Sequence, residues 1–123
     1  MPTPTSLNGL SVLVLEDDFY IAEDAKAALE EAGATVLGPF AASREAIAEA
    51  AETGADCALV DLNLGSGQSF EPARRLLQMG VPVVVMTGYD ASIIPEAFSN
   101  VPCLQKPTQP RNIVAAVKRA CGR

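Results

Sequence analysis

Short apolar runs alternate with longer amphipathic stretches along most of the chain. The runs are three to five residues long and show little polar alternation, which is typical of strands buried on both faces of a sheet. We predict five strands, at residues 11–15, 35–37, 57–60, 83–86 and 101–104. The second is expected to end at Gly38-Pro39, because this dipeptide marks a turn.

The stretches between the strands repeat apolar positions at helical spacing, as Ile21, Ala25 and Ala28 do in the first of them. We predict helices at residues 20–32, 43–52, 70–79, 90–99 and 110–121. Gly33 ends the first helix, and Ser43 can cap the second. The fourth should be short and weak, because Pro95 cannot occupy a helix interior.

Five strand–helix units in succession predict an α/β fold, with a doubly wound five-stranded parallel sheet, helices on both faces and right-handed crossovers. The pattern does not determine the strand order. The chain has 123 residues, the size of one domain, which we place at residues 9–123. Residues 1–8 are polar and rich in Pro and Thr, and we expect a flexible tail there.

Charge and composition exclude several classes of function. The formal net charge is −6 at pH 7, which disfavours direct binding of nucleic acid. The chain has no histidine, which excludes Ser-His-Asp and Cys-His catalytic centres and a role as histidine phosphodonor. No apolar run approaches the length of a membrane span, and the three cysteines show no CxxC spacing. We therefore expect a cytoplasmic protein with reduced thiols and no membrane insertion.

Polar residues follow four of the predicted strands directly. They are Glu16-Asp17-Asp18, Asp61-Leu62-Asn63, Thr87-Gly88 and Lys106-Pro107. Because the carboxyl ends of parallel strands meet at one edge of a sheet, these groups should share one site. Clustered carboxylates repel one another, and Mg²⁺ with retained waters would relieve that repulsion. A strand-end aspartate such as Asp61 can then act as a nucleophile and form an acyl phosphate, while a lysine and a hydroxyl balance the charge.

Each of these residues has an ordinary structural alternative. Asp17 or Asp18 could cap the first helix, although Asp18 can do so while Asp17 binds metal. Asp61 could form a turn, Thr87 could be a strand-end hydroxyl, and Lys106 could be a solvated surface lysine. The predicted site would be wrong only if all of these alternatives were true at once.

The order and spacing of Glu16-Asp17, Asp61, Thr87 and Lys106-Pro107 resemble the receiver domain of bacterial response regulators in two-component signalling. The resemblance covers residues 10–123 and implies a stand-alone, flavodoxin-like (βα)5 domain with strand order 2-1-3-4-5. It also implies a phosphoacceptor that signals through protein–protein contacts. Such a domain is not an enzyme, although it catalyses its own phosphoryl transfer and slow dephosphorylation.

The same resemblance assigns roles within the magnesium site. Asp61 is the expected phosphorylation site. Asp17 would bind Mg²⁺ directly, Glu16 would act largely through a metal-bound water, and the backbone carbonyl of Asn63 would be a further ligand.

Two other residues would contact the phosphoryl group. Thr87 would bond one phosphoryl oxygen and move with it, and Lys106 would pair with another. The Lys106-Pro107 peptide bond is expected to be cis.

The implied partners are proteins. A sensor histidine kinase or a histidine phosphotransfer protein would donate the phosphoryl group, and a downstream protein would dock on the face formed by residues 90–99, 101–104 and 110–121. A homodimer stays open. Cys103 stands where the family usually has an aromatic switch residue, so we expect Thr87 and residues 88–99 to carry the signal instead.

Two other functions stay open. One is a Mg²⁺-dependent phosphohydrolase with Asp61 as nucleophile, which typically needs a carboxylate as general acid where this chain has Asn63. The other is a binding module that works without phosphate, against which the complete set of acids, threonine and lysine argues.

Overall fold

The computed structural model of the chain describes residues 7–41, 43–62, 70–88, 98 and 100–121, with only the backbone of Ser43. The elements are β1 (Ser11–Leu15), α1 (Phe19–Glu31), β2 (Thr35–Phe40), α2 (Ser43–Thr53), β3 (Cys57–Asp61), α3 (Glu71–Gln78), β4 (Val83–Thr87), β5 (Cys103–Gln105) and α4 (Pro110–Ala120). Most of the predicted helix at residues 90–99 lies outside the described residues.

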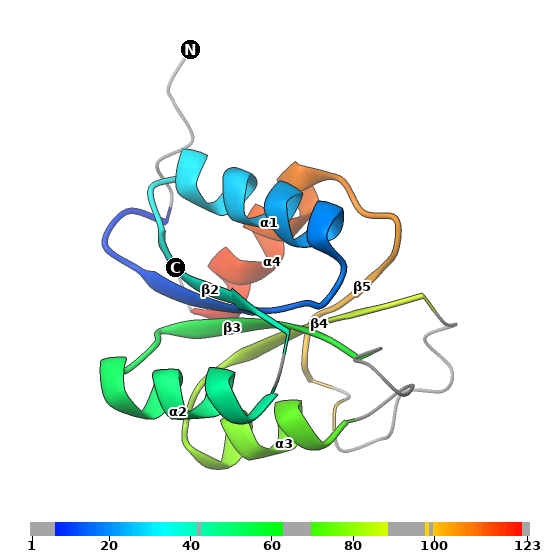
Figure 1. Cartoon of the computed structure of the whole chain (residues 1–123). Coiled ribbons are helices and arrows are strands. Elements are labelled where there is room, and N and C mark those ends of the chain that lie inside the picture. Colours follow the sequence, from blue (N-terminus) through cyan, green and yellow to red (C-terminus); the bar gives the residue numbers. More distant parts are fainter. Residues whose placement is uncertain (1–6, 42, 63–69, 89–97, 99, 122–123) are drawn as a thin grey trace.

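The strands form one parallel sheet in the order β2-β1-β3-β4-β5. This arrangement confirms the predicted α/β fold and the strand order that the resemblance implied. Figure 1 shows α1 and α4 on one face of the sheet and α2 and α3 on the other. No described helix has the length and apolar character needed to cross a membrane.

The two faces of the sheet carry two separate cores. Alternate residues of the same strand enter different cores, since successive side chains of a strand point to opposite faces. In β1, Val12 and Val14 pack with α1 and α4, whereas Leu13 and Leu15 pack with α2 and α3. The central strands are therefore apolar on both faces, which explains why their sequences show no alternation.

Helix α1 has the capping residues that the sequence predicts, although it begins and ends one residue earlier than residues 20–32. The carboxylate of Asp18 accepts the backbone N–H of Ile21 at 3.1 Å, which satisfies one of the donors that a helix start leaves unpaired. At the other end Gly33 adopts a φ of 101°, a left-handed conformation that suits glycine, and its N–H reaches the Glu30 carbonyl at 3.0 Å.

The prediction for β2 was wrong at its end. The strand continues through Gly38-Pro39 to Phe40, because an extra residue is accommodated as a bulge: Leu13 pairs with Leu37, but Leu15 pairs with Phe40. The sheet order makes β2 an edge strand, where the missing N–H of a proline is tolerated. The Gly38-Pro39 peptide bond is cis.

Most other boundaries agree with the prediction to within one residue, but β5 and the N-terminal segment differ more. Strand β5 begins at Cys103, two residues later than expected. Leu7, which the sequence places in the tail, is fully buried, and its N–H donates to the Ala32 carbonyl at 3.0 Å. The described part of the N-terminal segment therefore packs beneath the end of α1.

Candidate functional site

The predicted chemical residues gather at the carboxyl edge of the sheet. Asp61 is the last residue of β3 and Thr87 is the last residue of β4. Glu16 follows β1 directly, and Lys106 follows β5. Asp61, Thr87 and Glu16 are all buried, with at most 3% of their surface exposed. Asp61 and Thr87 are thus held on strands, and Glu16 and Lys106 are the first residues after strands.

Lys106 connects two of the carboxylates. Its Nζ lies 3.0 Å from Asp61 Oδ2 and 3.1 Å from Glu16 Oε1. Its backbone N–H donates to the Thr87 carbonyl at 2.8 Å, which fixes the lysine to the end of β4. The lysine side chain is 19% exposed, so the solvated-surface alternative is wrong.

Burial and mutual contact shift the ionisation of these groups. Burial, followed by contact with the Asp61 carboxyl, raises the pKa of Glu16 to about 7. Burial alone would lower the pKa of Lys106, but the carboxylates of Asp61 and Glu16 outweigh it and hold that pKa above its usual value. The lysine is therefore a permanent cation at the site, whereas the Glu16 carboxyl can either hold a proton or bind a second cation.

The carboxylates have the arrangement of a small metal site. Glu16, Asp17 and Asp61 each offer a carboxylate oxygen, and these atoms all lie within 4.8 Å of one another. Glu16 Oε1 is buried without a hydrogen bond of good geometry, although Lys106 Nζ is close to it. A hard cation would satisfy this oxygen, and the exposed position of Asp17 leaves room for the water ligands that Mg²⁺ retains. The residues present fit Mg²⁺.

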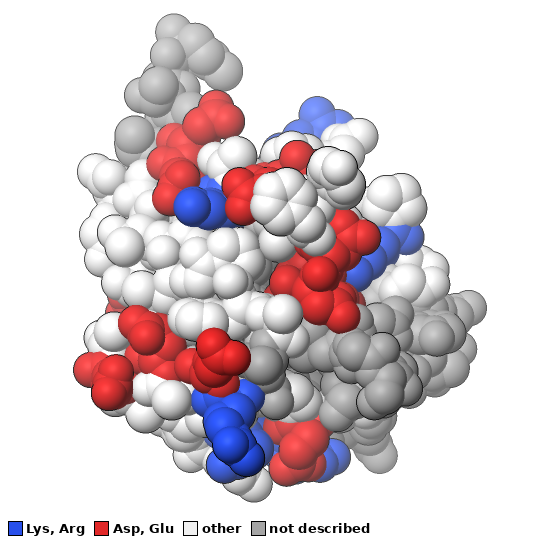
Figure 2. Space-filling view, viewed as in Figure 1, with Lys and Arg blue, Asp and Glu red and all other residues white. Residues whose placement is uncertain are grey.

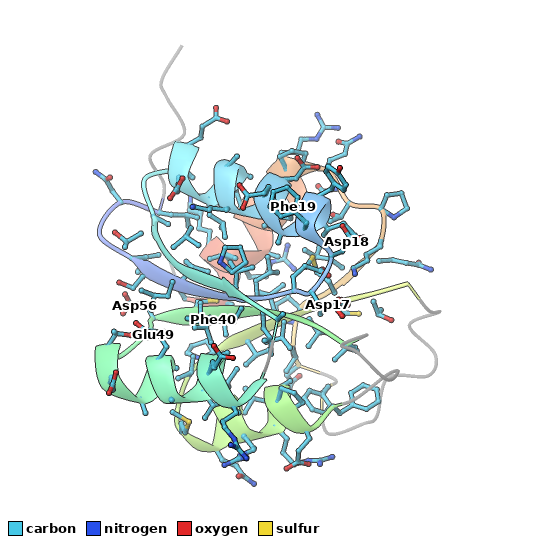
Figure 3. All side chains as sticks on the ribbon, in the orientation of Figure 1. Asp17, Asp18, Phe19, Phe40, Glu49 and Asp56 are labelled. Atoms are coloured by element: carbon cyan, nitrogen blue, oxygen red, sulfur yellow. The ribbon has the colours of Figure 1, made fainter. Side chains whose placement is uncertain are left out.

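Asp17 and its neighbour Asp18 divide two tasks between them. Asp18 caps α1, and its N–H donates to Glu16 Oε2 at 3.0 Å. Asp17 stays beside the other carboxylates at the mouth of the site, as the sequence predicts. Figure 2 shows acidic side chains gathered at this part of the surface, and Figure 3 shows Asp17 and Asp18 where β1 leads into α1.

Other predicted features of the site have different outcomes. Asp61 belongs to the sheet, in register with Met86, so its alternative as a turn former is wrong. The Lys106-Pro107 bond is cis, as the resemblance implied. Asn63 lies outside the described residues.

One supporting residue, Phe40, was not predicted by the sequence analysis. Its carbonyl accepts the backbone N–H of Glu16 at 2.9 Å and so ties the acidic segment to β2. This contact depends on the bulge in β2, and a glycine–proline pair is ordinarily a sign that a strand has ended.

A parallel sheet in this order, with three carboxylates, a buried threonine and a lysine at its carboxyl edge, defines a receiver-type α/β domain. The family model of the response regulator receiver domain matches residues 12–118. The chain belongs to this family, whose members are signalling modules of two-component systems. No curated protein sequence matches the chain.

Solved structures agree with this assignment. The signal receiver domain of a modulated diguanylate cyclase from Desulfovibrio desulfuricans G20 is 30% identical, with a TM-score of 0.80 over 91% of this chain and 93% of that one. SdrG from Sphingomonas melonis Fr1 is 29% identical, with a TM-score of 0.77 over 96% of this chain and 98% of that one. The chemotaxis protein CheY4 from Vibrio cholerae is 22% identical, with a TM-score of 0.79 over 90% and 98%, and shows the fold alone.

Proposed function

We propose that this chain is a phosphoacceptor response regulator of the cytoplasm, in which Asp61 accepts a phosphoryl group from a histidine of a partner protein. The partner is a sensor histidine kinase or a histidine phosphotransfer protein. The observation that carries the proposal is the position of Asp61: its carboxylate lies 3.0 Å from the Lys106 ammonium and within 4.8 Å of the carboxylate oxygens of Glu16 and Asp17.

The chemical step follows from these positions. A carboxylate oxygen of Asp61 attacks phosphorus, the bond between phosphorus and the donor's imidazole nitrogen breaks, and its electron pair stays on that nitrogen. Mg²⁺ held by Glu16, Asp17, Asp61 and the backbone carbonyl of Asn63 would neutralise charge on the transferring oxygens. Lys106 balances a further negative charge, and the Thr87 hydroxyl donates to a phosphoryl oxygen.

Asp61 is well placed as the nucleophile for a structural reason. It ends a strand in which all five residues are buried, so the carboxylate cannot swing away from the site. Asp17, next to it in the acidic cluster, is exposed, so the cluster lies at the surface that a partner's histidine would approach.

The phosphorylated chain would signal by binding another protein. We assign the docking face to β5, α4 and residues 90–99, because β5 runs directly into Lys106 and pairs with β4, which ends in Thr87. The same face could also hold a second copy of this chain in a homodimer. Neither a phosphohydrolase nor a phosphate-independent module is favoured by a specific contact in the described residues.

The proposal is tested by the mass of the intact protein. We expect one phosphate per chain after incubation with Mg²⁺ and acetyl phosphate, and loss of that phosphate in alkali. The Asp61→Asn variant should show no added mass. Asp56→Asn is the matched control, because Asp56 lies just before β3, at the opposite edge of the sheet from Asp61. Figure 3 shows Asp56 far from Asp17 of the acidic cluster.

Two results would contradict the proposal. One is an unchanged mass shift in Asp61→Asn, which would place the phosphate on another residue. The other is continuous release of inorganic phosphate with no phosphorylated protein detectable at early times, which would instead support the phosphohydrolase.

A further inference from the structure

Two cysteines meet at the edge of the sheet that lies opposite the acidic site. Cys57 begins β3 and is fully buried in the core beneath α1 and α4. Cys121 follows the last turn of α4 and packs against the same core while remaining partly exposed. Residues that are 64 positions apart in the chain, 57 and 121, therefore become neighbours.

A hydrogen bond places the Cys121 thiol beside the start of β3. The thiol of Cys121 donates to the carbonyl of Asp56, the residue just before Cys57, over 3.6 Å. Burial raises the pKa of the Cys57 thiol well above its usual value, and the nearby Cys121 thiol adds to that rise. Both sulfurs thus lie on the same side of the first residues of β3.

The third cysteine has a different environment. Cys103 lies on β5 and packs in the other core, against the side of the sheet that α2 and α3 cover. Burial raises the pKa of the partly exposed Cys103 thiol as well, so Cys57 and Cys103 should both react slowly. Cys103 is therefore a natural internal control for any reaction that depends on the pairing of Cys57 with Cys121.

We propose that Cys57 and Cys121 form a reversible dithiol–disulfide site that joins the end of α4 to the start of β3. Oxidation would be by thiol–disulfide exchange with a small organic disulfide of the glutathione disulfide class. This site is separate from the acidic edge and does not depend on phosphorylation of Asp61.

The exchange proceeds in two balanced steps. The deprotonated sulfur of Cys121, the more exposed of the two, attacks one sulfur of the small disulfide and displaces one thiolate, leaving a mixed disulfide. The sulfur of Cys57 then attacks the Cys121 sulfur and displaces the second small thiolate. The protons that Cys57 and Cys121 lose appear on the two small thiols, and the protein is oxidised by two electrons. The second step is slow, because the buried Cys57 thiol resists deprotonation.

The link would restrain the unfolded chain. It closes a loop that contains β3, α3, β4, β5 and α4, so the oxidised protein should unfold at a higher temperature. A shift of the unfolding midpoint on the order of 10 °C is expected for a loop of this length.

Peptide mapping tests the proposal directly. The protein is incubated with glutathione disulfide, alkylated and cut with trypsin, which places Cys57 in residues 45–74, Cys121 in residues 120–123 and Cys103 in a third peptide. We expect a cross-linked pair of residues 45–74 and 120–123, and an intact mass lower by two hydrogen atoms. The pair should form equally in Cys103→Ser and should be absent from Cys121→Ser.

The remaining outcomes overturn the proposal. A glutathione adduct that persists on Cys121 without the cross-link would show that Cys57 cannot reach it. A cross-link that contains Cys103, or one that joins two chains, would show that the contact between Cys57 and Cys121 does not govern the oxidation. Because Cys57→Ala alters the core, the partly exposed Cys121→Ser is the deciding variant, and the unfolding midpoint confirms that it folds.

Discussion

At the scale of single residues, the acidic edge is a balance of charge around Lys106. One ammonium group lies within 3.1 Å of two carboxylates, Glu16 and Asp61, and Asp17 adds a third carboxylate close by. One cation cannot neutralise three anions in a largely buried site. The protein must therefore take up either a proton or a metal ion there, and the two choices predict opposite responses to pH.

Glu16 makes the stability of the metal-free protein depend on pH. Its pKa is raised from 4.5 to about 7 in the folded protein, so the folded state holds a proton that the unfolded state releases within that window. The contribution of Glu16 to the free energy of unfolding should therefore be largest below about pH 4.5. It should fall as the pH rises from about 4.5 to about 7, and level off at higher pH. Thermal unfolding in the presence of a chelator measures this dependence.

A matched variant and added metal give the controls for this prediction. Glu16→Gln should remove most of the fall, since the amide does not titrate. Saturating Mg²⁺ should also oppose the fall, because the cation replaces the proton. A metal-free wild type whose stability rises through the same pH window would contradict the assignment to Glu16.

Asp17 should contribute to metal affinity more than to stability. It is the exposed member of the acidic cluster, and its removal lowers the charge and the number of ligands at once. We expect Asp17→Ala to bind Mg²⁺ at least about tenfold more weakly, measured by NMR titration of backbone amides at the strand ends. Glu23→Ala, an exposed acidic position on α1, is the control. Equal affinity in Asp17→Ala and wild type would mean that the metal binds elsewhere.

At the scale of secondary-structure elements, the bulge in β2 supports the site from the edge of the sheet. Gly38 has a φ of 99°, and a Cβ there would lie 2.7 Å from the Phe40 ring, 2.8 Å from the Phe40 nitrogen and 3.0 Å from the Val14 carbonyl oxygen. Two of these three atoms are backbone and cannot move without disturbing the strand pair. The bulge therefore requires glycine for two separate reasons, conformation and space.

This requirement gives a paired prediction. Gly38→Ala should lower the free energy of unfolding by about 3 kcal/mol, because strain and a backbone clash add together. Gly80→Ala, where φ is 84° and a Cβ would meet no atom within 4 Å, should lower it by only about 1 kcal/mol. Urea denaturation of both variants measures the difference. Equal losses would show that the clash at Gly38 is relieved by movement of Phe40.

The outcome for each element reflects whether its cause is local. Strands β1, β3 and β4 were predicted because each is a continuous apolar run, and Asp61, Thr87 and Glu16 could be placed because each follows such a run. The length of β2 could not be predicted, since its bulge depends on pairing with β1 rather than on Gly38-Pro39 itself. The contact between Cys57 and Cys121 is likewise set by the packing of α4, which no local pattern encodes.

At the scale of the whole molecule, the proposed function requires a signal to pass from Asp61 to a surface that a partner can recognise. Thr87 is the nearest candidate to carry it, because it is buried at the end of β4 and its carbonyl holds Lys106. Phosphorylation that draws the Thr87 hydroxyl toward the phosphoryl group would alter the chain that follows. Cys103 is a poor alternative carrier of the signal, because a cysteine has no aromatic ring that could rotate.

Hydrogen exchange with and without beryllofluoride, a mimic of the aspartyl phosphate, tests this route. We expect the protection of backbone amides to change most between Thr87 and Asn100, with little change at Cys103. Asp61→Asn treated in the same way should show no response. Changes confined to α1, between Ala22 and Gly33, would instead indicate that the signal leaves by the opposite face of the sheet.

The division of the interior into two cores has an evolutionary consequence. Val12 and Leu13 are neighbours in the chain, yet they belong to packing layers that touch only through the sheet. Substitutions in different layers should therefore show little epistasis, whereas substitutions within one layer should depend on each other. The helices α1 and α4 could then drift toward a new partner while α2 and α3 keep their packing, and the acidic edge, which belongs to the strands, would be inherited unchanged by each variant.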